Sequence, residues 1–316
     1  MCGLFGFTNY SRSTIKDLAK LTNSLAEQSA VRGTDATGIA FCNDKGENVI
    51  KESKSAYKLR FKHSDKIVSL LGHTRHSTQG SEKKNFNNHP FSGKCKNASF
   101  AFAHNGVLNN DRELRLELKL PKTKIETDSY ISVQLIEKKQ YLGFDSIKYM
   151  AEKTEGSFSY SILDDKNNIW LVKGSSPLSI IHFPKLKLYV YASTDEILYK
   201  AIVEYEPTFS ALKKGEIENI KISEGDILKI RNDGILDKGS FEYKEHFSRP
   251  WWDWGPYYSS VSLYKEAEGY GRQDYIDDLK AFAPSFGYDE SEVDRLIDIG
   301  FTLDEIEEFM YCGGEI

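Results

Sequence analysis

The sequence predicts an α+β fold in which two antiparallel sheets carry packed helices. Short apolar runs of strand length fall into two groups, one before about residue 110 and one after residue 156. Helical periodicity lies mainly between the groups, and no regular alternation of strand and helix runs through the chain. Turn residues such as Asn232-Asp233-Gly234 separate neighbouring runs. This separation of strand-rich and helical segments favours two antiparallel sheets over one parallel sheet.

The first strand-rich segment begins at the N-terminus, where residues 3–7 predict a buried strand. Thr14 and Asp17 then match the capping pattern of a helix, and apolar residues recur every three or four positions to about Arg32. A turn at 43–46 joins the next two strands as a hairpin. Strands of this group are expected at residues 39–42, 48–51, 67–71 and 100–103.

The centre of the chain is predicted to be helical, and the segment after residue 156 returns to strands. One helix opens at residues 126–130 and another covers 145–153, each with an apolar face at helical spacing. A third helix is expected at 195–205, among the strands of the second group. These strands are expected at residues 158–163, 169–172, 178–183, 188–192, 227–230 and 235–236.

The C-terminal part of the chain has a different composition. Residues 265–316 contain 15 acidic and 4 basic residues, although the whole chain of 316 residues has a net charge of only −5. An aromatic, proline-punctuated stretch precedes this acidic part, and its side chains are expected to dock on the main body rather than on a partner. We predict a main domain at 2–240, a linker at 241–262 and a small acidic helical appendage at 263–316.

Cysteine usage and hydropathy indicate a protein of a reducing compartment. The four cysteines, at positions 2, 42, 95 and 312, have no framework spacing. No charged start leads into an apolar run, and no apolar segment reaches the length of a membrane span. We expect a cytoplasmic protein that directly contacts neither a membrane nor nucleic acid.

A cysteine at the second position gains chemical meaning if Met1 is removed. Cys2 would then carry a thiol and a free α-amine on one residue. The thiolate is the nucleophilic form, and the free thiol has a pKa of about 8.5. Because the α-amine has a pKa of about 8, part of it is unprotonated at neutral pH and can act as the adjacent base. One residue would thus supply both nucleophile and base.

Further polar groups at the ends of predicted elements match the needs of an amide-hydrolysing cysteine. Asn105 and Gly106 follow a strand, and a side-chain amide beside a backbone N–H suits a developing oxyanion. Arg75 presents a fork that matches a carboxylate, and Asp128 can accept from an ammonium group. Taken singly, such an Arg is more often a surface residue and such an Asn-Gly pair a turn. Together they indicate an α-amino acid with a side-chain amide, which is glutamine.

Six short motifs carry a family resemblance. They read CGLFG at 2–6, RGTDATG at 32–38, GHTRHST at 72–78, NHPF at 88–91, HNG at 104–106 and ETDS at 126–129. In this order they resemble the class II glutamine amidotransferases, which are N-terminal-nucleophile hydrolases such as the glutaminase domains of glucosamine-6-phosphate synthase and glutamine phosphoribosylpyrophosphate amidotransferase. Each motif alone is weakly specific, whereas six in family order are strongly specific. The resemblance spans about residues 2–240.

The resemblance implies a four-layer αββα sandwich and an enzyme that hydrolyses glutamine through a γ-glutamyl thioester. It implies that Cys2 is the nucleophile with its own amine as the base, after removal of Met1. Asn105 and Gly106 would form the oxyanion hole.

The same resemblance assigns the groups that hold L-glutamine. Arg75 would bind the α-carboxylate and Asp128 the α-ammonium. Ser129 stands where these relatives commonly have Thr, a small departure. Further matched positions are Thr78 and His89, which line or support the pocket, and Arg32 and Gly33, in the loop that supports the nucleophile.

No acceptor domain accompanies these motifs. Sugar-isomerase, phosphoribosyltransferase and ATP-pyrophosphatase motifs are missing, and about 75 residues after position 240 are too few for such a domain. The expected partner is therefore a separate ammonia-accepting synthase, with water as the other possible acceptor. No cofactor is expected. A metal is not expected either, because His73 and His76 lack further ligands at suitable spacing.

Two other functions stay open at this stage. The chain is alternatively a hydrolase of another γ-glutamyl amide, or a regulatory protein with vestigial catalysis whose acidic tail recruits a partner. Within the tail, residues 293–309 place Gly300-Phe301 between amphipathic helical segments, which is similar to the three-helix ubiquitin-associated module. The other interpretation of the tail is a helical appendage that covers the body or mediates self-association.

Overall fold

The computed structural model describes residues 2–11, 15–43, 46–244, 272–286 and 288–298, with positions 301, 303 and 306. The chain forms two compact units, Met1–His246 and Phe247–Ile316. Most of the predicted linker, from residue 245 onward, lies outside the described residues. At the predicted start of that linker, Phe241 is buried and packs with Tyr243 against Phe158 of the first unit.

The first unit contains two antiparallel sheets. The first sheet contains β1 (Gly3–Asn9), β2 (Ala36–Asn43), β3 (Gly46–Glu52), β4 (Ser69–Arg75), β9 (Ser179–Phe183), β10 (Leu188–Ala192) and β11 (Glu218–Asn219). The second contains β5 (Phe91–Lys94), β6 (Ser99–Leu108), β7 (Gly156–Asp164), β8 (Ile169–Lys173), β12 (Asp226–Ile230) and β13 (Leu236–Ser240). Their strand orders are β11-β9-β10-β1-β4-β2-β3 and β13-β12-β8-β7-β6-β5.

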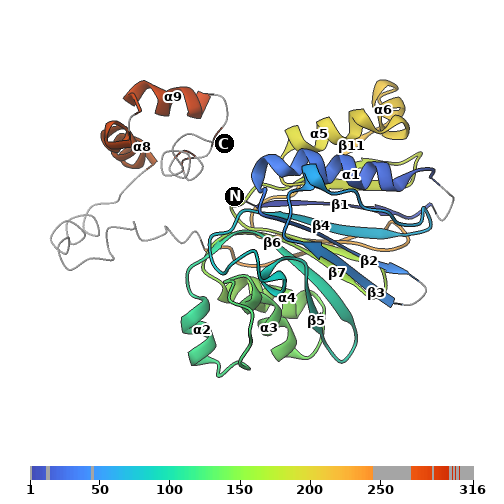
Figure 1. Cartoon of the computed structure of the whole chain (residues 1–316), viewed down its shortest axis with the longest axis horizontal. Helices are drawn as coiled ribbons and strands as arrows, with labels where there is room; N and C mark the ends of the chain where they lie inside the picture. The colour runs from blue at the N-terminus through green and yellow to red at the C-terminus, as the bar shows by residue number, and fades with distance from the viewer. Residues whose placement is uncertain are drawn as a thin grey trace. The chain divides into compact units, whose positions relative to one another are not determined.

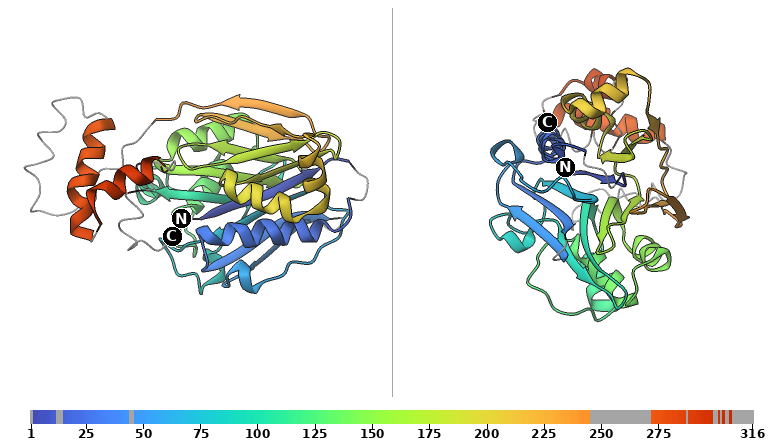
Figure 2. Two further views of the ribbon diagram at one scale, coloured as in Figure 1. Left: turned by 90° about the horizontal axis from the view of Figure 1, so that it is seen from above. Right: turned by 90° about the vertical axis from the view of Figure 1, so that its right-hand side faces the viewer.

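Helices cover the outer face of each sheet. The helices of the first unit are α1 (Leu18–Ser29), α2 (Asp111–Glu117), α3 (Tyr130–Lys139), α4 (Phe144–Lys153), α5 (Asp195–Glu204) and α6 (Glu206–Lys213), of which α1, α3, α4 and α5 form the two outer layers. Figure 1 and Figure 2 show α1 and α5 on one side of the paired sheets and α3 and α4 on the other. The first unit is therefore an αββα sandwich, as the sequence predicted.

Three apolar clusters hold the four layers together. The cluster under α1 and α5 includes Phe5 and Phe7 of β1, whereas Leu4 of the same strand belongs to the cluster between the sheets. The third cluster joins Phe100 and Phe102 of β6 to α3 and α4. Because the central strands of each sheet are buried on both faces, they are mostly apolar on successive residues rather than on alternate ones. This is why the predicted strands were recognisable as continuous apolar runs.

Several predicted boundaries were wrong in informative ways. The first helix begins at Leu18 instead of near residue 15, and its N-terminal cap comes from a distant loop. Asp65 accepts hydrogen bonds of 2.9 Å from the backbone N–H groups of both Asp17 and Leu18. Asp17 itself makes no side-chain cap, and its φ is 62°. The local capping pattern therefore does not start this helix at the predicted point.

The two strands with the polar motifs are longer than predicted. β4 continues to Arg75, and β6 continues through Asn105 and Gly106 to Leu108. Arg75, Asn105 and Gly106 thus lie within paired strands and not in the loops after them. The sequence prediction also missed β5, α2, α6 and β11, which are short or lack a clear apolar period.

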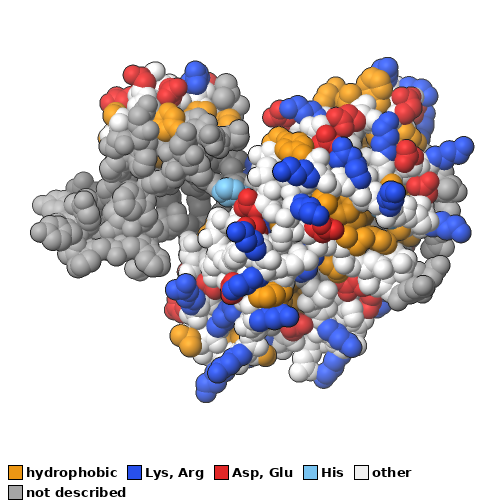
Figure 3. Space-filling view, in the orientation of Figure 1, with side chains coloured by type: hydrophobic (Ala, Val, Ile, Leu, Met, Phe, Trp, Pro, Cys, Tyr) orange, Lys and Arg blue, Asp and Glu red, His pale blue; other side chains and the backbone are white. Residues whose placement is uncertain are grey.

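On the face of the first unit drawn in Figure 3, basic, acidic and hydrophobic side chains are interspersed. Among the described residues, no helix combines the length and the apolar character that a membrane crossing requires.

The second unit contains two described helices, α8 (Arg272–Phe282) and α9 (Glu290–Asp298), joined by the 3₁₀ turn η5 (Ala283–Phe286). Leu279, Ala283, Val293, Leu296 and Ile306 form its small apolar cluster. The division at residues 240 and 262 and the resemblance to a ubiquitin-associated module stay predictions.

Candidate active site

The site is built where β1 and β4 of the first sheet approach β6 of the second. Cys2 directly precedes β1, and Gly3 pairs with Thr74 beside the end of β4. Nε2 of His73 lies 2.9 Å from the carbonyl oxygen of His104, which ties β4 to β6 one residue before Asn105. The charges of Arg75 and Asp128 both act on the Cys2 thiol. Four predicted residues that lie far apart in the sequence are therefore close together in the structure. They are Cys2, Arg75, Asn105 and Asp128.

The loop after α1 holds the backbone of Cys2. Nε of Arg32 donates a 2.9 Å hydrogen bond to the Cys2 carbonyl oxygen. A Cβ atom at Gly33 would lie 2.4 Å from the carbonyl carbon of Arg75, so only glycine allows this backbone approach. The next turn is fixed as well, because the backbone N–H of Asp35 donates to the Arg75 carbonyl oxygen over 3.0 Å.

Burial dominates the electrostatics of the Cys2 thiol. It raises the pKa of the thiol above its ordinary value, and the positive charge of Arg75 opposes that shift. The thiol group lies 3.5 Å from the carbonyl oxygen of His76, to which it donates. At neutral pH the group is therefore mostly a thiol, so a nucleophilic attack requires a base.

Asn105 has an unusual environment. Its side chain is only 1% exposed, yet neither its amide nitrogen nor its amide oxygen has a hydrogen-bond partner in the described part of the chain. A buried polar group without a partner costs about 1–3 kcal/mol, so it normally marks a missing ligand or water. The next residue, Gly106, has a φ of 134°, and a Cβ atom there would lie 2.1 Å from the carbonyl oxygen of Ser157. Both features fit two adjacent donors for an oxyanion.

Arg75 is buried, and the loop that follows β4 fixes its guanidinium. Nη1 donates to the side-chain oxygen of Asn88 over 2.7 Å, and Nη2 donates to the carbonyl oxygens of Gln79 and Gly80, each over 2.7 Å. These bonds use three of the five N–H donors of the group. A bidentate grip on a carboxylate would need Nη2, so it requires one of the two backbone carbonyls to be displaced.

Asp128 lies just before α3, and the residue is 4% exposed. Oδ2 accepts a 2.7 Å hydrogen bond from the backbone N–H of Leu108, and Oδ1 lies 3.2 Å from Oγ of Ser129. No ion pair of Asp128 occurs among the residues that the structure describes, so the carboxylate has capacity for a cationic ligand.

The two remaining pocket candidates lie in different surroundings. Thr78 is exposed in the loop after β4. His89 is buried, and its ring packs against His73 and Phe91 with centroid distances of 4.2 and 4.3 Å. Neither ring nitrogen of His89 has a partner among the described residues, and burial holds the pKa of His89 well below its usual range.

Three residues of the site had no predicted role. Asn88 orients Arg75, while His104 and Ser129 lie next to Asn105 and Asp128. All three belong to the motifs that carry the resemblance, which was the only signal for them in the sequence. In the described residues no group of His, Cys, Asp and Glu side chains is arranged to hold a metal ion.

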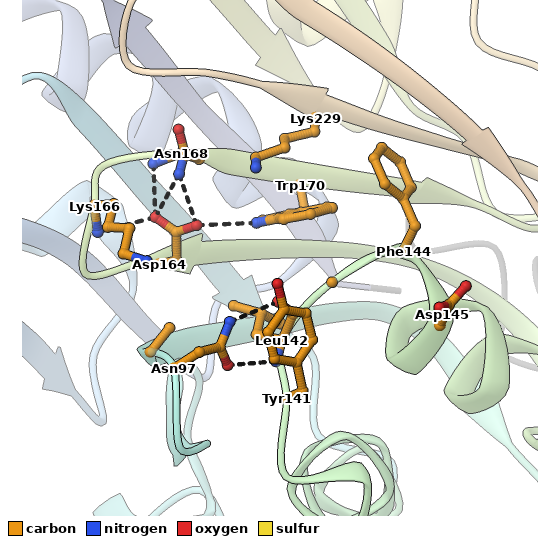
Figure 4. A pocket seen from close by; sticks show the side chains of 12 residues that line it. Asn97, Tyr141, Leu142, Phe144, Asp145, Asp164, Lys166, Asn168, Trp170 and Lys229 are labelled. Atoms are coloured by element: carbon orange, nitrogen blue, oxygen red, sulfur yellow. Dashed lines mark hydrogen bonds between the residues drawn. The ribbon is translucent and has the colours of Figure 1, made fainter.

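A separate cavity of about 360 Å³ lies elsewhere on the first unit. Figure 4 shows Asp164 at its wall, accepting from the side chains of Asn168 and Trp170. Asp164 pairs with Phe100, five residues along β6 from Asn105. At about 3.4 Å per residue this separates the cavity from the site by roughly 17 Å. The cavity contains none of the predicted site residues.

A sandwich of two antiparallel sheets between helical layers, with a cysteine directly before a central strand, fits the N-terminal-nucleophile class of protein that the sequence motifs indicated. Two family models match the chain. Residues 1–136 match class-II glutamine amidotransferases, and residues 73–200 match a glutamine amidotransferase domain. Between them the two models span residues 1–200, so the first unit contains a class II glutamine amidotransferase domain.

Curated relatives support this assignment. The chain is 33% identical over 192 residues to glutamine–fructose-6-phosphate aminotransferase [isomerizing] of Staphylococcus epidermidis, which covers 57% of this chain and 30% of that protein. It is 31% identical over 189 residues to the enzyme of the same name from Sulfurisphaera tokodaii, covering 57% and 31%. The chain thus matches less than a third of the length of these relatives.

Two solved structures share the fold. Glutamine phosphoribosylpyrophosphate amidotransferase from B. subtilis, complexed with ADP and GMP, is 21% identical with a TM-score of 0.58, covering 77% of this chain and 50% of that one. A structure described as the allosteric regulatory enzyme of purine biosynthesis is 20% identical with a TM-score of 0.59, with the same coverage. At this level of identity the likeness concerns the fold alone.

Proposed function

We propose that this chain hydrolyses the side-chain amide of L-glutamine at Cys2, giving L-glutamate and ammonia. The observation that carries the proposal is the buried Asn105 amide, whose two polar atoms have no partner in the described structure. A carbonyl oxygen of a bound substrate would supply the acceptor that the amide N–H groups lack. Asn105 also lies on the strand that His73 ties to the end of β4, beside the nucleophile.

The first chemical step is attack by sulfur. Removal of Met1 frees the α-amine of Cys2, which takes the thiol proton as Sγ forms a bond to the amide carbon. The electrons of the carbonyl bond move onto oxygen, and the oxyanion accepts from the side chain of Asn105 and the backbone N–H of Gly106. One such donor is worth about 3–4 kcal/mol in the transition state.

Ammonia leaves in the second step. The carbonyl bond reforms, the carbon–nitrogen bond breaks, and the proton held by the α-amine passes to the departing nitrogen. The product is a γ-glutamyl thioester on Cys2. Water then attacks this thioester with the amine again as the base, the carbon–sulfur bond breaks, and glutamate leaves while the thiol is restored.

Charged groups hold the substrate backbone. Arg75 binds the α-carboxylate and Asp128 the α-ammonium, because opposite charges in a buried site interact more strongly than in water. Thr78 and His89 complete or support the pocket. The loop with Arg32 and Gly33 keeps the Cys2 backbone in place, a role supported by the bond from Arg32 to the Cys2 carbonyl.

We also propose that the ammonia passes to a separate synthase, since these 316 residues contain no acceptor motif. A cytoplasmic location is proposed on cysteine usage, and Cys42 and Cys95 are buried free thiols in keeping with it.

Two measurements on the purified full chain test the proposal. Mass spectrometry should find Met1 missing, and glutamate and ammonia should form in equal amounts from L-glutamine. Cys2→Ala should abolish turnover. The matched control is Cys95→Ala, which removes another free thiol far from the site and should leave turnover unchanged. Full activity in Cys2→Ala, or an active protein that retains Met1, would contradict the mechanism.

A further inference from the structure

The carboxylate of Asp128 depends on hydrogen bonds for its stability. It is buried, it makes no ion pair among the described residues, and its partners are the Leu108 backbone and the Ser129 hydroxyl. A hydrogen bond to a charged group is roughly twice as strong as one between neutral groups. The orientation of the Ser129 hydroxyl therefore helps to fix the direction in which this carboxylate points.

His104 controls the Ser129 hydroxyl. Its Nδ1 lies 2.8 Å from Oγ of Ser129, closer than the 3.2 Å between Oγ and Oδ1 of Asp128. The hydroxyl has one hydrogen to give. If Nδ1 of His104 carries a hydrogen, it donates to Ser129, and Ser129 donates to Asp128. If Nδ1 is bare, Ser129 donates to His104 and Asp128 loses a donor.

The first arrangement is the more favourable one, because it satisfies a buried charge. Its cost is that Nε2 of His104, without a hydrogen, faces the carbonyl oxygen of Ser157 at 3.3 Å. That contact is longer and involves neutral groups, so the charged bond to Asp128 outweighs it. The His104–Ser129–Asp128 arrangement is thus a directional chain of donors that ends on the carboxylate.

His104 also belongs to β6, the strand that carries the proposed oxyanion donors Asn105 and Gly106. His104 directly precedes Asn105 in β6, and its carbonyl oxygen accepts from His73 of β4. Leu108, which donates to Asp128, lies in the same strand. The carboxylate is therefore tied to β6 at two points, on either side of Asn105 and Gly106.

We propose that His104 and Ser129 are positioning residues that aim Asp128 at the α-ammonium group of the substrate and fix it relative to the oxyanion donors. This inference rests on the proposed function, in which Asp128 binds that group. Neither residue touches the reacting amide. Their loss is expected to weaken recognition of the ammonium group and to leave binding of the rest of the substrate unchanged.

The test measures dissociation constants by titration calorimetry with the full chain in a Cys2→Ala background, where no substrate is consumed. The two probes are L-glutamine and 4-carbamoylbutanoate, which is glutamine without its α-amino group. Ser129→Ala should weaken glutamine binding about tenfold, in line with one lost bond to a charged group, and change binding of the analogue less than twofold. Ser129→Thr keeps the hydroxyl and should restore glutamine binding to within about twofold.

If the Ser129 variants fold poorly, a second pair of variants, at His104, tests the same proposal. His104→Asn places an N–H donor near the Nδ1 position and should retain the preference for glutamine, whereas His104→Leu should lose it. Equal weakening of both probes, or no weakening of either, would overturn the positioning role. Asp128→Asn separates this failure from that of the proposed function. If Asp128→Asn leaves the preference for glutamine intact, the ammonium-binding role of Asp128 is wrong. If it removes the preference and Ser129→Ala does not, only the positioning role is wrong.

Discussion

Asn105 shows how one residue can be optimal for a ligand and poor for stability. Its amide is buried without partners, so it contributes nothing to the folded state and costs desolvation energy. Asn110, five residues further along the chain, is a buried asparagine whose side-chain amide does have hydrogen-bond partners. That side chain donates to the Lys153 carbonyl over 2.9 Å and accepts from the Glu155 N–H over 3.0 Å.

We expect Asn105→Ala to lower kcat for glutamine by about 10²–10³, because one oxyanion donor is lost. Its free energy of unfolding should not decrease, because no hydrogen bond is broken and the desolvation cost of the unpartnered amide is removed. Asn110→Ala is the matched control and should show the reverse, with a loss of about 1–3 kcal/mol in stability and unchanged kcat. Steady-state kinetics and urea unfolding check both. A large loss of stability in Asn105→Ala would contradict the interpretation.

The pH dependence of the reaction is also decided at one residue. Burial raises the pKa of Cys2, so the thiol stays protonated at neutral pH and attack depends on the unprotonated α-amine. With an α-amine pKa of about 8, kcat/KM should rise from about pH 6 to about pH 9 and then level off. A pH–rate profile on glutamine checks this, and a rate that falls over the same interval would exclude the amine as base.

At the scale of elements, α1 shows that a helix can be started from outside its own sequence. The Asp65 carboxylate accepts from the first N–H groups of the helix, with one oxygen for each. This carboxylate also complements the positive end of the helix dipole.

We predict that Asp65→Ala costs about 1 kcal/mol of stability, the usual value for a lost cap, and leaves KM for glutamine unchanged. The neighbouring exposed Lys66 provides the control, because Lys66→Ala removes a charge without touching the cap. The urea midpoint of Asp65→Ala should therefore lie below that of Lys66→Ala. Equal midpoints would show that backbone solvation replaces the cap at no cost.

At the scale of the whole molecule, the two sheets enclose three histidines. Burial holds the pKa of His73 at about 3 and lowers the pKa values of His89 and His104. Each folded-state pKa lies below the unfolded value of about 6.5. The contribution of these neutral rings to stability is therefore complete above pH 6.5 and is lost as the pH falls toward 3.

The free energy of unfolding should consequently decrease from pH 6.5 downward. His89→Leu removes a buried ring whose nitrogens have no partner among the described residues, so it should reduce the slope of stability against pH in this interval. His76→Gln changes an exposed histidine outside this buried group and serves as the control. Urea unfolding at a series of pH values measures both slopes, and identical slopes for His89→Leu and the native chain would refute the assignment.

The sequence by itself determined the fold class, the positions of most strands along the chain and the family. These features depend on local patterns: apolar runs buried on both faces, helical spacing, and six short motifs in one order. It also singled out Cys2, Arg75, Asn105 and Asp128, because together their side chains match the needs of glutamine hydrolysis and each lies in one of the six motifs.

Only the tertiary structure decided how these residues meet. The pairing of β1 with β4 and β10, the Asp65 cap on α1, and the chain from His104 through Ser129 to Asp128 all join segments distant in sequence. No local pattern encodes them, because a hydrogen bond across 25 or 47 residues depends on where the intervening chain folds. The physical reason is burial. Where two sheets exclude water, a polar group between them needs a hydrogen-bond partner from another part of the fold or from a bound ligand.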